Sequence, residues 1–353
     1  MKLIRTIKED SPIDISKVPT PIERKPVSQP VSPSFTPSPY QAAIFDFIQH
    51  QQGSAIIQAV AGSGKTTTIV EATKLVPAGN LVLFLAFNKS IATELGERLP
   101  DTVSSATFHS VAFKAWNRYA KGCRVEARKT ANLLHTAVEI GFINEEEADV
   151  YGSSVIKLVG LAKNAGIGAI VRDTPEEWRN LVDHFDITIE ANEDRCLEIA
   201  HAIFNASSHK VNARTVDFDD MLYLPLKYNV SFDKYDVIFV DESQDTNRVQ
   251  RALLRAMLRV GGRLIAVGDR YQAIYGFRGA DSSAMDRIAE EFDCVELPLS
   301  ISYRCPQAVV RAAQQYVNGI EASPTAKEGT VQTMGTMKLS SFNTTDVIVC
   351  RNT

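Results

Sequence analysis

A short loop of small residues, AVAGSGKT from Ala59 to Thr66, constrains the fold of this chain more than any other segment. An apolar run over 55–60 precedes the loop, and a helical pattern over 67–75 follows it. A glycine turn between a strand and a helix points backbone N–H groups at one place, where they can hold phosphates. Lys65 would then reach the β- and γ-phosphates, and the Thr66 hydroxyl would ligate Mg²⁺. Alanine at the first position departs from the strict GxxxxGK[ST] pattern, but the strand and helix around the loop favour nucleotide binding.

Three more apolar runs of strand type, 81–86, 236–240 and 264–267, are each followed by a turn and a helical pattern. This alternation predicts an α/β fold in which helices cover a parallel sheet. A first helix is expected directly after Tyr40-Gln41. Between roughly 110 and 215 the strand pattern stops. The periodic segments in that interval predict an inserted α-helical subdomain, with helices around 131–140, 155–165 and 196–205.

Two adjacent carboxylates follow one of the predicted strands. The run 236–240 ends in Asp241-Glu242. Such a pair can divide two tasks, because Asp241 can hold Mg²⁺ while Glu242 orients and deprotonates the attacking water. An acidic cap on the following helix is the structural alternative. The loop that ends at Thr66 favours the first interpretation.

Composition excludes several classes of protein. The 353 residues carry 38 Lys and Arg against 42 Asp and Glu, and the net charge of −4 excludes a uniformly basic nucleic-acid binder but not a local basic groove. Five scattered cysteines without a CxxC pair argue against a disulfide framework and a structural zinc site. No apolar stretch is long enough for a spanning helix, and the charged N-terminus does not resemble a secretory signal. We therefore expect a soluble protein without a membrane partner, cytoplasmic in a prokaryotic or phage host and nuclear in a eukaryote.

Residues 1–39 differ in composition from the rest of the chain. They hold eight of the 15 prolines, with many serines and few aromatic residues. Such a segment cannot bury enough apolar surface to offset its ordering entropy, and we predict a disordered Pro-rich leader. It is either a plain linker or a tether for a protein partner.

Several motifs in a fixed order resemble those of superfamily 1 DNA helicases of the UvrD/Rep group. Residues 266–281, AVGDRYQAIYGFRGAD, resemble the coupling motif of that group, and DESQD at 241–245 resembles its form of the Walker B motif. TFHS at 107–110 and LAFNKS at 85–90 resemble its DNA-contacting motifs, the second in a version similar to F-box DNA helicases and phage relatives. DFDDML at 217–222 and LSISYR at 299–304 resemble the segment before Walker B and the motif that opens the second motor domain.

The resemblance implies a P-loop NTPase of RecA-like fold that uses ATP and Mg²⁺. The residues that it assigns to turnover are Lys65, Glu242, Gln272 and Arg304. Those that it assigns to the nucleotide are Gln41, Ala61, Gly62, Ser63, Gly64, Lys65, Thr66, Thr67, Tyr303 and Arg304, with Thr66 and Asp241 at the metal. Gln41 would bind the adenine edge, Tyr303 would stack on the base, and Gln272 would touch the γ-phosphate.

The same resemblance implies contacts to single-stranded DNA or tailed duplex DNA. The residues concerned are Phe87, Asn88, Lys89, Thr107, Phe108, His109, Phe277 and Arg278. The rings of Phe87, Phe108 and Phe277 are candidates for base stacking, which is indifferent to sequence. Because Gln272 and Phe277 share one loop, that loop would report the state of the nucleotide to the DNA strand.

Six basic residues lie within sixteen positions, with Glu126 as the only acidic one: Lys114, Arg118, Lys121, Arg124, Arg128 and Lys129. A solvated helix face is one interpretation. A surface that contacts phosphates at the mouth of the inserted subdomain is the other.

These observations predict four parts: a leader at 1–39, a RecA-like ATPase domain at 40–109 and 211–298, a helical subdomain at 110–210, and the start of a second RecA-like domain at 299–353. The last strand pattern, at 346–353, resembles the early part of that second domain, and the later motifs of the family have no counterpart. The chain would then be a fragment or a natural truncation. We expect weak ATPase and no unwinding from it alone.

The function that these motifs imply is that of an ATP-dependent DNA helicase motor with 3′–5′ polarity. A single-strand translocase that displaces proteins or recombination filaments without unwinding shares every motif. A non-catalytic DNA-binding fragment with a vestigial nucleotide site is the third possibility, although intact Lys65, Asp241, Glu242, Gln272 and Arg304 argue against decay.

Overall fold

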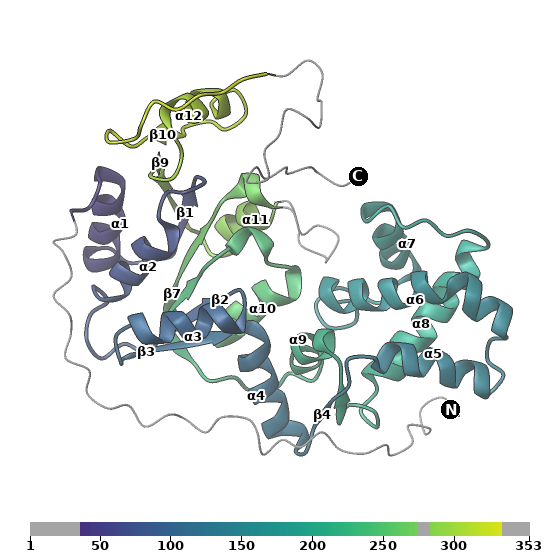
Figure 1. Ribbon diagram of the computed structural model, residues 1–353. Helices are drawn as coiled ribbons and strands as arrows, with labels where there is room; N and C mark the ends of the chain where they lie inside the picture. Colours follow the sequence, from purple (N-terminus) through teal and green to yellow (C-terminus); the bar gives the residue numbers. More distant parts are fainter. Residues whose placement is uncertain (1–35, 274–282, 334–353) are drawn as a thin grey trace.

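The computed structural model describes residues 36–273 and 283–333, and a six-stranded parallel sheet forms its centre (Figure 1). The strand order is β3-β2-β6-β7-β1-β8, and all five neighbouring pairs are parallel. The strands are β1 (Ala55–Ala59), β2 (Val82–Ala86), β3 (Val103–Thr107), β6 (Tyr235–Val240), β7 (Leu258–Gly268) and β8 (Val295–Leu299). The predicted α/β fold with a parallel sheet is confirmed.

Helices cover both faces of the sheet, and alternate strand residues supply the two hydrophobic cores. Ile57 packs with α1 (Pro39–His50), α2 (Lys65–Thr73) and α3 (Lys89–Arg98). Its neighbour Ile56 packs on the other face. The helices of that face are α4 (Phe108–Ala120), α9 (Phe218–Lys227), α10 (Arg248–Met257) and α11 (Ala284–Glu291). Apolar side chains on both sides of a strand are expected where helices cover both faces of the sheet.

The sequence did not predict β3 and β8, which lie at the two edges of the sheet. Their sequences, VSSAT and VELPL, carry polar or exposed residues instead of a continuous apolar run. An edge strand has a neighbour on one side only and tolerates such residues. The prediction therefore failed where burial is weakest.

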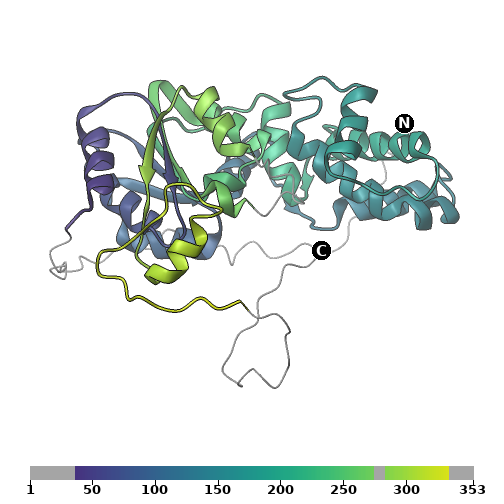
Figure 2. The same ribbon diagram turned by 90° about the horizontal axis from the view of Figure 1, so that it is seen from above.

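Four helices form a separate body beside the sheet domain, as two views at right angles show (Figures 1 and 2). They are α5 (Lys129–Glu139), α6 (Glu145–Ala165), α7 (Pro175–His184) and α8 (Glu193–Ser208), and they share their own core with α4 and α9. The two-residue strands β4 (Arg124–Val125) and β5 (Thr215–Val216) pair in parallel where the chain leaves and re-enters the sheet domain. The domain boundaries stay a prediction.

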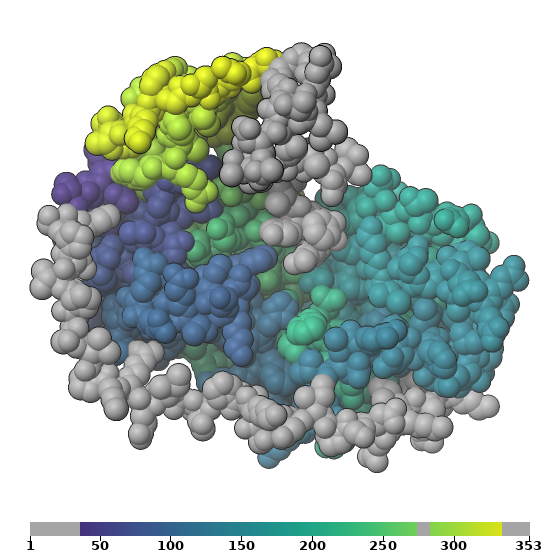
Figure 3. Space-filling model, in the orientation of Figure 1, coloured from purple at the N-terminus to yellow at the C-terminus, as the bar shows by residue number. Residues whose placement is uncertain are grey.

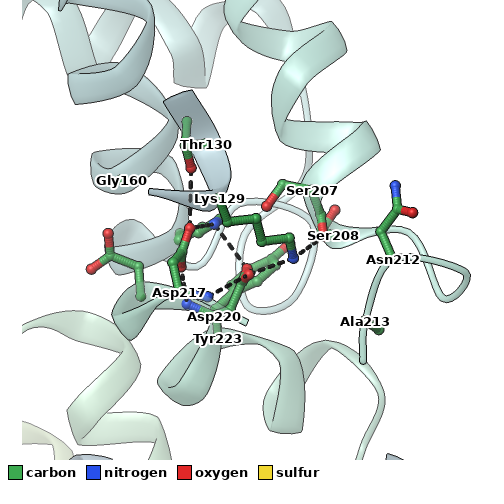
Figure 4. A network of polar contacts seen from close by, with 12 residues as sticks. Lys129, Thr130, Gly160, Ser207, Ser208, Asn212, Ala213, Asp217, Asp220 and Tyr223 are labelled. Atoms are coloured by element: carbon green, nitrogen blue, oxygen red, sulfur yellow. Dashed lines mark hydrogen bonds and ion pairs between the residues drawn. The ribbon is translucent and has the colours of Figure 1, made fainter. Parts of the chain in front are cut away.

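Buried charges join this helical body to the sheet domain at the start of α9 (Figure 4). Lys129 Nζ lies 2.6 Å from Asp220 Oδ2, and Lys163 Nζ lies 2.7 Å from Asp217 Oδ2 and 2.8 Å from Asp220 Oδ1. All four side chains are buried. Because two cations face two carboxylates, the charges compensate one another within the interior.

Residues 299–333 fold against the phosphate-binding loop. They contain β9 (Ile301–Ser302), α12 (Gln307–Ala313) and β10 (Glu321–Ala322), and Val310 and Ile320 pack on Val60. In the space-filling view these residues, yellow and yellow-green, lie directly on the N-terminal part of the sheet domain (Figure 3). The expected strand at 346–353 and the leader before residue 36 lie outside the described residues.

Candidate nucleotide and DNA site

The loop between β1 and α2 has the backbone that phosphate binding requires. Gly62 and Gly64 adopt positive φ angles of 74° and 78°, and α2 begins at Lys65 directly after them. Ser63 is fully buried, and its hydroxyl finds no hydrogen-bond partner among the described residues. A helix N-terminus with free N–H groups beside a buried polar side chain is suited to an anion.

The acidic pair at the end of β6 meets this loop, although 175 residues or more separate the partners. Lys65 Nζ lies 2.7 Å from Glu242 Oε2, and Thr66 Oγ1 lies 3.2 Å from Asp241 Oδ2. Burial raises the pKa of Asp241 to about 6, and the neighbouring carboxylate of Glu242 adds to this rise. A hydroxyl and a desolvated carboxylate are the hard oxygen ligands that Mg²⁺ takes together with phosphate and water. Thr66 and Asp241 therefore fit a magnesium ion.

A chain of hydrogen bonds runs from Lys65 to Gln272, beginning with the contact of Lys65 to Glu242. Gln244 Nε2 donates to Glu242 Oε2 at 2.8 Å, and Gln244 Oε1 accepts from the Asp269 N–H at 3.0 Å. Gln272 Nε2 then donates to Asp269 Oδ2 at 2.6 Å. Gln244 belongs to the short helix η2 (Ser243–Asp245), and Gln272 to η3 (Arg270–Gln272). The structure thus connects the nucleotide loop with the first part of the coupling motif.

Sequence reasoning gave Gln244 no role. Its side chain is buried, and a β-carbon on Gly268 would lie 2.5 Å from Gln244 Oε1, which leaves room only for glycine there. Glu242 itself has a positive φ of 51°, a strained conformation for a residue with a side chain. The signal that could have pointed to Gln244 was its place two residues after Glu242, in the same strand-end turn.

The segment after β8 touches the phosphate-binding loop. The Tyr303 N–H donates to Gly62 O at 2.9 Å, and Ser302 Oγ donates to Ala61 O at 2.8 Å. A β-carbon on Gly62 would lie only 2.5 Å from Arg304 Cβ. The side chain of Tyr303 is half exposed. The structure therefore brings Tyr303 and Arg304 to the loop; their contacts to a nucleotide stay predictions.

Gln41 lies beside α2, but its amide already has partners. Gln41 Nε2 donates to Thr68 Oγ1 at 3.0 Å, and Gln41 Oε1 accepts from the Ser38 N–H at 2.9 Å as part of a capping box. The side chain is buried. A hydrogen bond to adenine would use its second N–H or replace one of these contacts, and the contact stays a prediction.

Six of the eight residues predicted to contact DNA lie where β2 and β3 end. These strands are neighbours in the parallel sheet, so that Phe87-Asn88-Lys89 and Thr107-Phe108-His109 lie at one edge. Phe87 is 42% exposed and can present its ring to a ligand. Asn88 and Thr107 cap α3 and α4 through their side-chain oxygens, which accept the N–H groups of Ile91 and Ser110. Their side chains therefore also fix the starts of these two helices.

The prediction that Phe108 stacks on a base is wrong. Its side chain is only 7% exposed and belongs to the core beneath the sheet. Phe108, Ala112 and Ala115 lie on one face of α4 at helical spacing, and this face is buried. The apolar periodicity of α4 was the signal for core packing.

Phe218 lies where a stacking ring was expected. It is 56% exposed at the start of α9, and the His109 ring meets it edge-on at a centroid distance of 6.3 Å. Burial lowers the pKa of His109, which favours a neutral ring suited to hydrogen bonding. Phe277 and Arg278 lie outside the described residues.

The six clustered basic residues do not form one surface. Lys129 is buried in the ionic cluster, and a role for it in contacting phosphate is therefore wrong. Lys114 and Arg118 pair with Asp233 at 3.2 and 2.7 Å. Lys121, Arg124 and Arg128 are exposed.

Comparison with known proteins agrees with this architecture of a P-loop sheet and a helical insert. Residues 41–293 match the model of the UvrD/REP helicase N-terminal domain, and the chain belongs to this family. The resemblance noted from the motifs is confirmed.

Several similar proteins are ATP-dependent DNA helicases named PcrA. The one from Bacillus subtilis strain 168 is 26% identical over 302 residues, which cover 76% of this chain and 38% of the relative. The one from Leuconostoc citreum is 24% identical over 297 residues, covering 77% of this chain and 38% of the relative. The chain therefore spans well under half the length of these relatives. Within the described ranges, no helix has the length and apolar character to cross a bilayer.

Proposed function

We propose that this chain is the ATP-binding part of a DNA helicase motor, in which hydrolysis of ATP drives 3′–5′ movement along single-stranded DNA and the unwinding of duplex. The observation that carries this proposal is the hydrogen-bonded chain Lys65–Glu242–Gln244–Asp269–Gln272. Through these hydrogen bonds, binding of a nucleotide at the loop would affect the position of Gln272 in the coupling motif. Family membership and the PcrA relatives support it.

Nucleotide binding would begin by exchanging partners at Lys65. The ammonium group of Lys65 now pairs with Glu242, and phosphate oxygens would replace the Glu242 carboxylate as its partner. Mg²⁺, held by Thr66 and Asp241, would neutralise phosphate charge. Glu242, released from Lys65 but still held by Gln244, would orient and deprotonate the attacking water. Arg304 would add positive charge from the second segment.

The released Glu242 would also change the rest of the chain of hydrogen bonds. Gln244 binds Glu242 through its N–H₂ group and Asp269 through its oxygen, and cannot shift toward one without affecting the other. Asp269 in turn holds Gln272. A change of charge at the loop would thus reach η3 through the side chains of Glu242 and Gln244 and then through the backbone N–H and the carboxylate of Asp269.

The DNA strand would lie across the ends of β2 and β3. Phe87 and Phe218 are exposed rings, and His109 lies between the end of β3 and Phe218. Stacking on such rings contributes roughly 1–3 kcal/mol per base without regard to sequence. This suits a motor that moves along any strand.

Phosphate release with and without oligothymidylate tests the proposal. We expect turnover that DNA stimulates, its loss in Lys65→Ala and Glu242→Gln, and retained ATP binding in Glu242→Gln. Lys74→Ala is the matched control, because Lys74 lies just beyond α2, is half exposed, and pairs with Glu71 on the surface. Turnover of Glu242→Gln at the parental rate would refute its role as base.

ATP binding without any stimulation by DNA would instead favour a non-catalytic DNA-binding fragment. Protein displacement without strand separation would favour a translocase.

A further inference from the structure

A cavity of about 350 Å³ lies at the far end of α4 from the predicted DNA-contacting residues. Trp116, Tyr119 and Ala120 line it from α4, and Lys210, Ala213 and Arg214 line it from the segment between α8 and β5. α4 begins at Phe108, directly after β3, and its pocket-lining residues 116–120 therefore lie roughly 12–18 Å along the helix from the end of β3. Figure 1 shows α4 running from the sheet to β4 at the base of the helical body. The proposed nucleotide and DNA sites do not use this pocket.

The aromatic part of the pocket is held rigidly. Trp116 is fully buried, and its indole N–H donates to Ala213 O at 2.9 Å. The Tyr119 ring lies 5.2 Å from Trp116 and 6.3 Å from Tyr228, centroid to centroid, yet the residue is 46% exposed. Tyr228 is fixed in turn, because its hydroxyl donates to Ser208 O at 2.9 Å. An exposed ring supported by two others costs little entropy to use as a binding platform.

Several cations lie at the pocket or next to it. Lys210 and Arg214 line it, and Lys121 follows Ala120 in the chain. Across residues 36–273 and 283–333, none of the three forms an ion pair with a carboxylate, whereas Asp233 neutralises Lys114 and Arg118 earlier on the same helix. The whole chain is acidic, with a net charge of −4. The pocket is therefore a local positive patch on an acidic chain, and its charge attracts an anionic ligand.

We propose that this pocket is a second contact for single-stranded nucleic acid, in which Lys210 and Arg214 bind backbone phosphates and Tyr119 stacks on a base. Cations beside an exposed aromatic ring are the combination that binds single strands without sequence preference. An acidic polypeptide would use the charges but would gain little from the ring. The proposal rests on the proposed function in one respect, which is that the same DNA strand would reach both surfaces. Binding at the pocket itself needs no ATP.

Binding of labelled oligothymidylates to the full chain tests the pocket. One oligonucleotide is short enough for the β2–β3 surface only, and the other is long enough to reach the pocket. For the long probe, Lys210→Glu/Arg214→Glu should weaken binding at least tenfold. It should also reduce the slope of log K against log salt by roughly 1.4, since each single-strand phosphate contributes about 0.7. Tyr119→Ala should weaken binding of the long probe roughly five- to a hundredfold, and Tyr119→Phe should restore it.

The control is Lys157→Glu/Arg172→Glu, which reverses two exposed cations of the same helical body. It should change binding of the long probe less than twofold, and no variant should alter binding of the short probe or of a fluorescent ATP analogue. Equal losses in the pocket variant and the control would overturn the proposal, as would unchanged oligothymidylate binding together with lost binding of polyglutamate. Failure of ATP binding in the parent chain would count against the proposed function and leave this test intact.

Discussion

At the scale of single residues, Gly62 shows most directly how the loop and the following segment fit together. Its carbonyl accepts the Tyr303 N–H, and its missing side chain leaves the space that Arg304 occupies. Gly64 has nearly the same φ angle, but nothing lies within 4 Å of its would-be β-carbon. Substitution of Gly64 therefore tests backbone strain alone, whereas substitution of Gly62 tests backbone strain together with the fit of Arg304 against the loop.

Gly62→Ala should lower the free energy of unfolding more than Gly64→Ala. Both substitutions place alanine at positive φ, which costs roughly 1–2 kcal/mol. Only Gly62→Ala also pushes Arg304 away from the loop, and its loss should exceed that of Gly64→Ala. Urea denaturation without nucleotide measures both values. Equal losses would mean that residues 302–304 do not rest on the loop.

The residue scale also shows what the sequence could predict. Lys65, Thr66, Asp241 and Glu242 were assigned to one nucleotide site from their motifs, and the structure brings them into contact. Phe108 was misassigned, because a motif match outweighed the apolar spacing of its own helix. Lys129 looked like one more surface charge, since nothing local reveals that Asp220, 91 residues away, receives it in the interior. Burial of a charge depends on tertiary contacts that no short pattern encodes.

At the scale of elements, the ionic cluster of Lys129, Lys163, Asp217 and Asp220 fixes the start of α9 against α5 and α6. Lys163→Met should lower the free energy of unfolding by roughly 3–5 kcal/mol, because it leaves two buried carboxylates with one cation. Lys157→Met, on the exposed side of the same helix, should change it by no more than about 0.5 kcal/mol. Urea denaturation provides the measurement. A small loss at Lys163 would show that water reaches the cluster.

Asp219, next to this cluster, predicts a dependence of stability on pH. Burial raises its pKa from 3.8 to about 6, with a contribution from the charge of Asp217. As the pH rises from about 4 to 6, the unfolded chain loses this proton before the folded one, and the free energy of unfolding falls. Asp219→Asn keeps an oxygen that can accept from Asn164 and should remove between about 1 and 3 kcal/mol of this fall. Identical pH profiles for parent and variant would contradict the shifted pKa.

In the helical body, the sequence predicted long helices but not very short strands. Its long helices follow from apolar spacing, and α5, α6 and α8 were all expected. Strands β4 and β5 were not, because two residues are too few for a period to appear. Yet this short pair closes the base of the helical body and lies beside the pocket at Tyr119.

Across the whole molecule, we propose that the loop at Lys65 binds a nucleotide and that Glu242, Gln244 and Asp269 relay this binding to Gln272. The contacts that carry it join β1, β6 and β7, three neighbouring strands of one sheet. A rigid sheet keeps these distances fixed, so that a new charge at one strand end acts directly on the next.

The most direct test is equilibrium binding of a fluorescent ATP analogue in the presence of Mg²⁺. We expect saturable binding to the parent chain and to Lys74→Ala, and at least tenfold weaker binding to Lys65→Ala. Binding to Glu242→Gln should be tighter, because its neutral side chain no longer competes for Lys65. Equal affinity of the parent and Lys65→Ala would show that the loop at Lys65 does not bind the nucleotide.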